Sequence, residues 1–134
     1  IEGHDDRLLV ANIHGINFTL GITAYREQLD QLFDSIQHHT GPMIVAGDFN
    51  TWSDERMSIV MDMAARLSLS SLDYTNHNHT RTLVFGNALD HVFYRGLDPL
   101  EPDTWYVTSS DHNPTRVSFR MKAGTDDDIY VAAK

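Results

Sequence analysis

The chain has 134 residues, with 10 Lys+Arg against 19 Asp+Glu, a formal net charge of −9 and no cysteine. This length fits one domain, and a hydrophobic fraction of 41% excludes a wholly disordered chain. The missing cysteines exclude disulfides and thiolate metal sites. The acidic balance argues against tight wrapping of nucleic acid, which needs clustered Lys and Arg, but a bound cation would still admit a phosphate ester.

The composition also bears on location and domain limits. No apolar run approaches the roughly 20 residues that a membrane helix needs, so we expect no membrane span and a cytoplasmic location. Residues 1–4 are typical of an expression-tag remnant. We expect one domain over residues 5–122, followed by a flexible acidic tail over residues 123–134.

The first half of the chain alternates between strand and helix patterns. Residues 7–13 form a short apolar run that predicts a buried strand. Residues 25–37 carry apolar side chains at helical spacing, and Gly41-Pro42 then ends that helix. A second buried strand is predicted over residues 43–46, and a second amphipathic helix over residues 54–67.

The second half favours strands. Residues 71–87 are polar and loop-like, with a weak strand over residues 82–85. Residues 89–94, 104–107 and 115–121 predict three further strands. Strands alternating with helices and then followed by strands indicate a layered α/β (α+β) domain.

Polar side chains cluster where these strands meet loops, which is where ligands bind in open α/β sheets. Each of them alone fits a helix cap or a turn equally well. The chain has no Gly-x-Ser-x-Gly elbow and no phosphate-binding glycine loop, so hydrolysis by a directly activated water is the remaining chemistry. The clustered residues are Asn12, His14, Asp48, Asn50, Asp90, His91, Asp111 and His112.

Four motifs in order carry a family resemblance. They are Asn12-Ile13-His14, Gly47-Asp48-Phe49-Asn50-Thr51-Trp52, Leu89-Asp90-His91-Val92-Phe93-Tyr94 and Ser110-Asp111-His112-Asn113-Pro114. The series resembles the endonuclease/exonuclease/phosphatase (DNase I-like) superfamily, and the sequence around His14 and Phe93 is similar to its bacterial YafD-like branch. The resemblance implies a layered β-sandwich flanked by helices, of which this chain would be the carboxy-terminal half.

The resemblance also implies roles for the central residues. Asp48 would orient or deprotonate the attacking water, and Asn50 would hold that water or a phosphoryl oxygen. His112, polarised by Asp90, would stabilise the charge of the transition state. His14 would supply a second donor to the phosphate.

Metal and substrate contacts are implied in the same way. Asp111, with Asp48, would hold Mg²⁺ or Mn²⁺, although the family's principal glutamate ligand has no counterpart here. We therefore expect little catalysis by this chain alone. Asn12 would contact substrate, Arg81 would meet phosphate or lie at the surface, and Trp52 would line the pocket or pack beneath it.

The leading hypothesis is a metal-dependent phosphoester hydrolase acting on a nucleic acid, a phospholipid headgroup or a soluble phosphate ester. The alternative is a non-catalytic fragment that self-associates or assembles through a sheet face exposed by the missing half. A third reading is a metal-binding module around His77 and His79.

Overall fold

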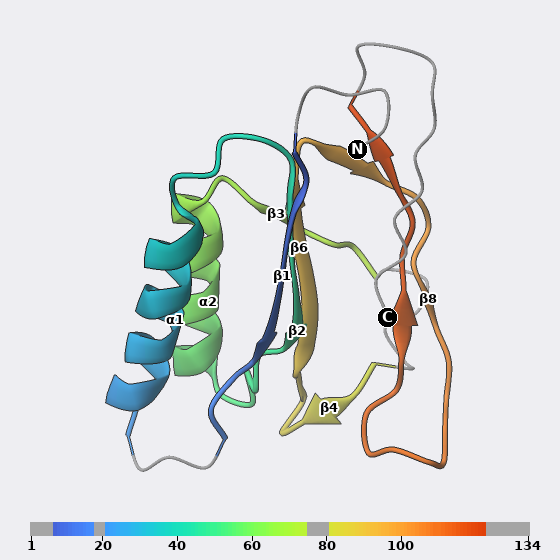
Figure 1. The fold of residues 1–134 in the computed structure, drawn as a ribbon. Helices are drawn as coiled ribbons and strands as arrows, with labels where there is room; N and C mark the ends of the chain where they lie inside the picture. Colours follow the sequence, from blue (N-terminus) through green and yellow to red (C-terminus); the bar gives the residue numbers. More distant parts are fainter. Residues whose placement is uncertain (1–6, 18–20, 75–80, 123–134) are drawn as a thin grey trace.

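The fold is taken from a computed structural model, which describes residues 7–17, 21–74 and 81–122. Figure 1 shows two helices on one side of a central sheet and shorter strands on the other side. The elements, in chain order, are β1 (Leu9–His14), α1 (Thr23–Ile36), β2 (Met43–Asp48), α2 (Asp54–Arg66), β3 (Ser70–Ser71), β4 (Leu83–Val84), β5 (Asn87–Ala88), β6 (Asp90–Arg95), β7 (Leu97–Pro99), β8 (Asp103–Thr104), β9 (Thr115–Arg116) and β10 (Phe119–Met121). The predicted mixed α/β fold class is confirmed, and the arrangement is consistent with part of a DNase I-like fold.

The central sheet has the strand order β1-β2-β6-β3. β1 runs parallel to β2, whereas β6 runs antiparallel to β2 and to β3. The register places His14 opposite Asp48, and Asp48 opposite Asp90. These three residues therefore form one row across the sheet, with their side chains on one face.

The two faces of the sheet carry separate cores. Met43, Val45 and Phe93 point toward α1 and α2 and join the helix residues Leu29 and Val60 in one buried cluster. The alternate residues point the other way, where Ile44 and Val92 pack with Phe119 of β10 in a second cluster. Because side chains alternate along each strand, the row of polar residues belongs to the face of this second cluster.

The face turned away from the helices is covered unevenly. Strands β7 and β10, paired with each other, lie over its β2–β6 part. On β1 the side chain of Val10 is 57% exposed. Among the described residues of the central sheet, Val10 is the large hydrophobic side chain left in solvent. The expected exposed sheet face is thus limited to β1 within the described part of the chain.

Two predicted strands in the second half are wrong in extent. The run over residues 104–107 gives only β8, which ends at Thr104, and residues 115–121 divide into β9 and β10. Trp105 and Tyr106 are 43% and 75% exposed, since neither has a sheet to pack against. The backbone N–H of Val107 donates instead to the side chain of Asn113, which closes a loop. The helices and strands of the first half agree with the prediction within about two residues.

None of the helices in the described ranges is long and apolar enough to cross a bilayer.

Gly47 is required where β2 approaches β1. Its φ of +142° is a conformation that side chains rarely adopt. A Cβ atom there would lie 2.0 Å from the carbonyl oxygen of Ile13, which is a backbone atom and cannot swing aside. The glycine before Asp48 therefore allows the close approach that sets the row of polar residues.

We predict that Gly47→Ala lowers the free energy of unfolding by at least about 4 kcal/mol, because strain and overlap add. Gly86→Ala is the matched control, since Gly86 also has a positive φ but nothing within 4 Å of its Cβ position. It should cost only about 1–2 kcal/mol. Urea denaturation measures both values, and equal losses would contradict the role of the close approach.

Candidate active site

Three strand ends and one loop bring the candidate site together. His14 ends β1, Asp48 ends β2 and Asp90 begins β6, and His112 comes from the loop between β8 and β9. The Nε2 atoms of His14 and His112 lie 3.7 and 3.6 Å from Oδ2 of Asp48. Asp48 is therefore the centre of the group.

Asp48 is oriented by the residues that follow it. Its Oδ1 accepts a hydrogen bond of 2.8 Å from the backbone N–H of Asn50, and its Oδ2 accepts one of 3.1 Å from the Asn50 side chain. The same amide donates to the carbonyl oxygen of Gly15 at 2.8 Å. Asn50 itself has a φ of +50°, which turns the chain sharply. The turn holds the carboxylate and the amide as one rigid unit.

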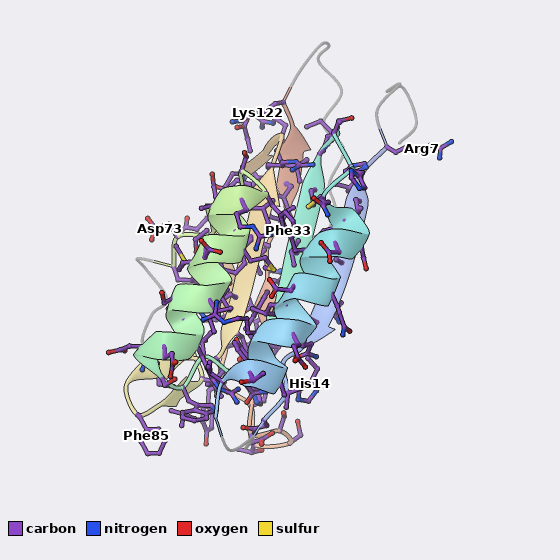
Figure 2. All side chains as sticks on the ribbon, turned by 90° about the vertical axis from the view of Figure 1, so that its left-hand side faces the viewer. Arg7, His14, Phe33, Asp73, Phe85 and Lys122 are labelled. Atoms are coloured by element: carbon purple, nitrogen blue, oxygen red, sulfur yellow. The ribbon has the colours of Figure 1, made fainter. Side chains whose placement is uncertain are left out.

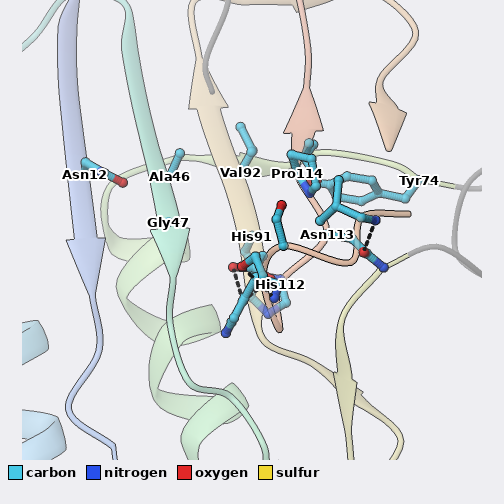
Figure 3. Close-up of a pocket in the computed structure, with 14 residues that line it drawn as sticks. Asn12, Ala46, Gly47, Tyr74, His91, Val92, His112, Asn113 and Pro114 are labelled. Atoms are coloured by element: carbon cyan, nitrogen blue, oxygen red, sulfur yellow. Dashed lines mark hydrogen bonds and ion pairs between the residues drawn. The ribbon is translucent and has the colours of Figure 1, made fainter. Parts of the chain in front are cut away.

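Asp90 and His112 form a close pair. Nδ1 of His112 lies 2.8 and 3.1 Å from the two carboxylate oxygens of Asp90, and Figure 3 shows His112 beside the strand that carries His91. Partial burial alone would lower the pKa of His112, but the hydrogen bond and the charge of Asp90 outweigh it and raise the pKa above its usual value. Asp48 adds to this effect. The pair therefore favours a protonated ring facing Asp48.

Arg81 supports Asp90 by a hydrogen bond to its backbone. Its guanidinium donates a hydrogen bond of 2.6 Å to the carbonyl oxygen of Asp90 and lies 4.1 Å from the ring centre of Tyr74. Burial raises the pKa of Asp90 despite the opposing effects of His112 and Arg81. Arg81 had been expected either at phosphate or at the surface. The structure places it half-buried against the backbone of Asp90.

His91 is a residue that the sequence analysis left without a role. It is 5% exposed and points toward the helices, opposite to Asp90. Thr51 Oγ1 donates to the carbonyl oxygen of Ala88 at 2.6 Å, so it can only accept from His91 Nε2 at 2.7 Å. The ring is therefore the neutral Nε2–H tautomer, with Nδ1 3.4 Å from the Arg81 guanidinium. Burial, followed by the charge of Arg81, lowers the pKa of His91 to about 4.

Two cavities adjoin the site. One of about 360 Å³ is lined by Asn12, Tyr74, Asp90 and His112, among others (Figure 3). The other, of about 280 Å³, is lined by Asn17, Asn50, Trp52, Val84, Phe85 and Leu89. Asn12, predicted to contact substrate, and Trp52, predicted to line the pocket or pack beneath it, thus line different cavities. The Arg56 guanidinium lies over the ring of Trp52, 4.6 Å from the ring centre.

The described residues include one group suited to a metal ion. Ligand atoms of Asp48, Asp90 and His112 all lie within 4.8 Å of one another. Asp111, a predicted ligand, is exposed and contributes no atom to this group. Two carboxylates with room for water fit a hard divalent cation. His77 and His79, considered for a separate metal site, lie outside the described residues.

Residues 4–112 match the model of the Endonuclease/Exonuclease/phosphatase family. This range contains every residue of the group at the sheet edge, from His14 to His112. The chain belongs to this family. Its members typically hydrolyse phosphoester bonds and generally use divalent metals, in agreement with the resemblance in the four motifs.

We predict that acid weakens this endonuclease/exonuclease/phosphatase fold through His91. The folded pKa of about 4 lies below the ordinary value of 6.5, so the unfolded chain takes up the proton first as the pH falls. The stability due to neutral His91 is thus complete above pH 6.5 and is lost toward pH 4, by up to about 3 kcal/mol.

The measurement is the urea midpoint at a series of pH values, with EDTA present. His91→Gln keeps a donor for Thr51 but does not titrate, so its acid loss should be shallower than that of the wild type. His38→Gln, on an exposed residue after α1, is the control and should keep the full slope. Parallel curves for the wild type and His91→Gln would contradict this role of His91.

Proposed function

We propose that the chain carries the water-activating and charge-stabilising residues of a metal-dependent phosphodiester hydrolase. The observation that carries this proposal is the convergence of Asp48, Asp90 and His112, from two strands and a loop, within 4.8 Å. Membership of the family supports phosphoester hydrolysis in general. The diester preference, the YafD-like branch, the position as the carboxy-terminal half and the cytoplasmic location are parts of the proposal.

Asp48 is the proposed base. Its Oδ2 faces both histidines, and its Oδ1 is already held by the backbone of Asn50, so the carboxylate is fixed before substrate arrives. A fixed carboxylate within reach of a water can orient it and take its proton. Both side-chain N–H groups of Asn50 already donate to Gly15 and Asp48. The proposed role of Asn50 is therefore to hold that water through its side-chain oxygen, without adding negative charge, and a contact with a phosphoryl oxygen rests on the resemblance alone.

His112 is the proposed donor to the phosphate. Its Nδ1–H is directed at Asp90, which leaves the Nε2–H to donate to a non-bridging oxygen of the phosphate. A protonated ring there would stabilise the negative charge that grows in the transition state. His14, with its side chain 80% exposed on the other side of Asp48, would be the second donor.

The proposed metal is Mg²⁺ or Mn²⁺. Asp48 and Asp90 would hold it, and waters would complete the shell. When bound, the cation would act as a Lewis acid on the phosphoryl oxygen and offset part of the acidic charge of the site. Asp111 remains a proposed ligand on the resemblance alone.

We predict that Asp48→Asn lowers the hydrolysis rate of bis-p-nitrophenyl phosphate by about a thousandfold or more, because an amide cannot accept the proton of the water. His112→Ala should cause a comparable loss. Asp62→Asn, on an exposed acid of α2, is the matched control and should keep full activity. Thermal unfolding within about 3 °C of the wild type would show that the variants fold.

The assay should use this chain and any longer product of its gene, since the resemblance places the principal glutamate ligand outside these residues. A longer product as inactive as its own His112→Ala variant would contradict the hydrolase proposal. Full metal-dependent activity of the 134-residue chain alone would contradict the need for that glutamate.

We further predict that EDTA abolishes hydrolysis and that Mg²⁺ or Mn²⁺ restores it. Calorimetric titration with Mn²⁺ should show affinity at least about tenfold weaker for Asp48→Asn, because a central ligand is lost. Asp62→Asn, on an exposed acid of α2, should stay within about threefold of the wild type. Hydrolysis that persists in EDTA would contradict the metal dependence.

A further inference from the structure

A hairpin tip places one aromatic side chain in solvent beside the candidate site. β4 and β5 are joined by Phe85 and Gly86, whose φ angles are +51° and +85°. Two successive positive φ values are typical of a type I′ turn, which favours Asn or Gly. Phe85 is 87% exposed, and Figure 2 shows it pointing outward at the end of the molecule where His14 lies. Neither backbone preference nor packing accounts for a phenylalanine at this position.

Phe85 also forms a wall of the cavity of about 280 Å³, together with Trp52 and Leu89. Asn50 lines the same cavity and donates its side-chain hydrogen bond to Asp48. The cavity therefore borders the candidate active site through Asn50. One ester arm of a phosphate held beside Asp48 would extend toward it.

We propose that this cavity binds a nucleobase on one arm of the phosphoester, and that Phe85 is a specificity-determining residue. This inference rests on the proposed hydrolase function. Two aromatic side chains among aliphatic walls suit a flat ring, which gains by stacking. A flat ring also suits this lining better than an acyl chain, which has no planar face to stack on Trp52 or Phe85.

The acidic charge of the chain and the lack of cations at the hairpin argue against a bilayer or a long polynucleotide as the occupant of the cavity. Residues 83–88 contain no Lys or Arg, and the chain carries a net charge of −9. Anionic membrane surfaces and polynucleotides are both bound through clustered cations. A short nucleotide ester brings only the charge of its phosphate, and that charge would lie at the metal site rather than at the hairpin.

The experiment compares two ligands that differ only in the base. Thymidine 5′-monophosphate and deoxyribose 5-phosphate are titrated calorimetrically into the protein used for the activity assay, with Mn²⁺ present. We expect the wild type to bind the base-bearing ligand about tenfold more tightly. Phe85→Asn should reduce this preference to about twofold or less.

Two features make the comparison specific. Asn suits the positive φ of the turn, so Phe85→Asn should be at least as stable as the wild type in thermal unfolding. Leu83→Ala removes another exposed apolar side chain of the same hairpin that does not line the cavity, and it should keep the tenfold preference.

Several outcomes would overturn the inference. Equal binding of both ligands by the wild type would refute it while leaving the hydrolase proposal standing. Loss of phosphatidylcholine vesicle binding in Phe85→Asn, without any base preference in the wild type, would assign the hairpin to a membrane instead. Binding of neither ligand, with no hydrolysis of bis-p-nitrophenyl phosphate, would refute both proposals.

Discussion

The geometry of the site depends on a set of hydrogen bonds that hold the end of β2 in place. The backbone N–H of Gly15 donates to the carbonyl oxygen of Asp48 at 2.7 Å, and that of Phe49 donates to Leu89 at 2.9 Å. The hydroxyl of Tyr25 donates to the carbonyl oxygen of Phe49 at 2.6 Å. Because Phe49 is fully buried between the sheet and the helices, the chain on either side of it has little freedom. Its two polar neighbours project from a rigid support.

The other half of the site is supported differently. Asp90 lies at a strand start braced by Arg81, while His112 lies in a loop whose backbone at the next residue, Asn113, donates to the side chain of Thr82. Arg81 and Thr82 precede the β4–β5 hairpin that carries Phe85. One segment thus contacts the residues that hold the carboxylate–imidazole pair and leads directly into the hairpin with the proposed base-binding wall.

The sequence predicted the parts of the molecule in which local pattern and tertiary packing agree. The buried strands and amphipathic helices of the first half are of this kind, and so are the four polar groups that meet at one edge. The segment with the exposed residues Trp105 and Tyr106 was predicted as a strand because aromatic residues have a high β-propensity. That propensity does not reveal whether a neighbouring strand is present to pair with the segment. The support given by Arg81 and His91 depends on contacts across the fold. We had grouped His91 with Asp90, although side chains of neighbouring residues in a strand point to opposite faces. Asp111 was assigned by resemblance to a motif, and its neighbour His112 belongs to the cluster instead.

The row formed by His14, Asp48 and Asp90 makes the geometry of the candidate site depend on the correct register of the strands. If β1 shifted by a single residue against β2, His14 would turn into the helix-side core and Ile13 would take its place in solvent. The shifted state is higher in free energy, because it would bury an imidazole and expose an aliphatic side chain. Selection for a well-packed interior therefore also preserves the geometry of the candidate site. A compact chain with a shifted register would keep a similar overall shape but would lose the row of polar side chains.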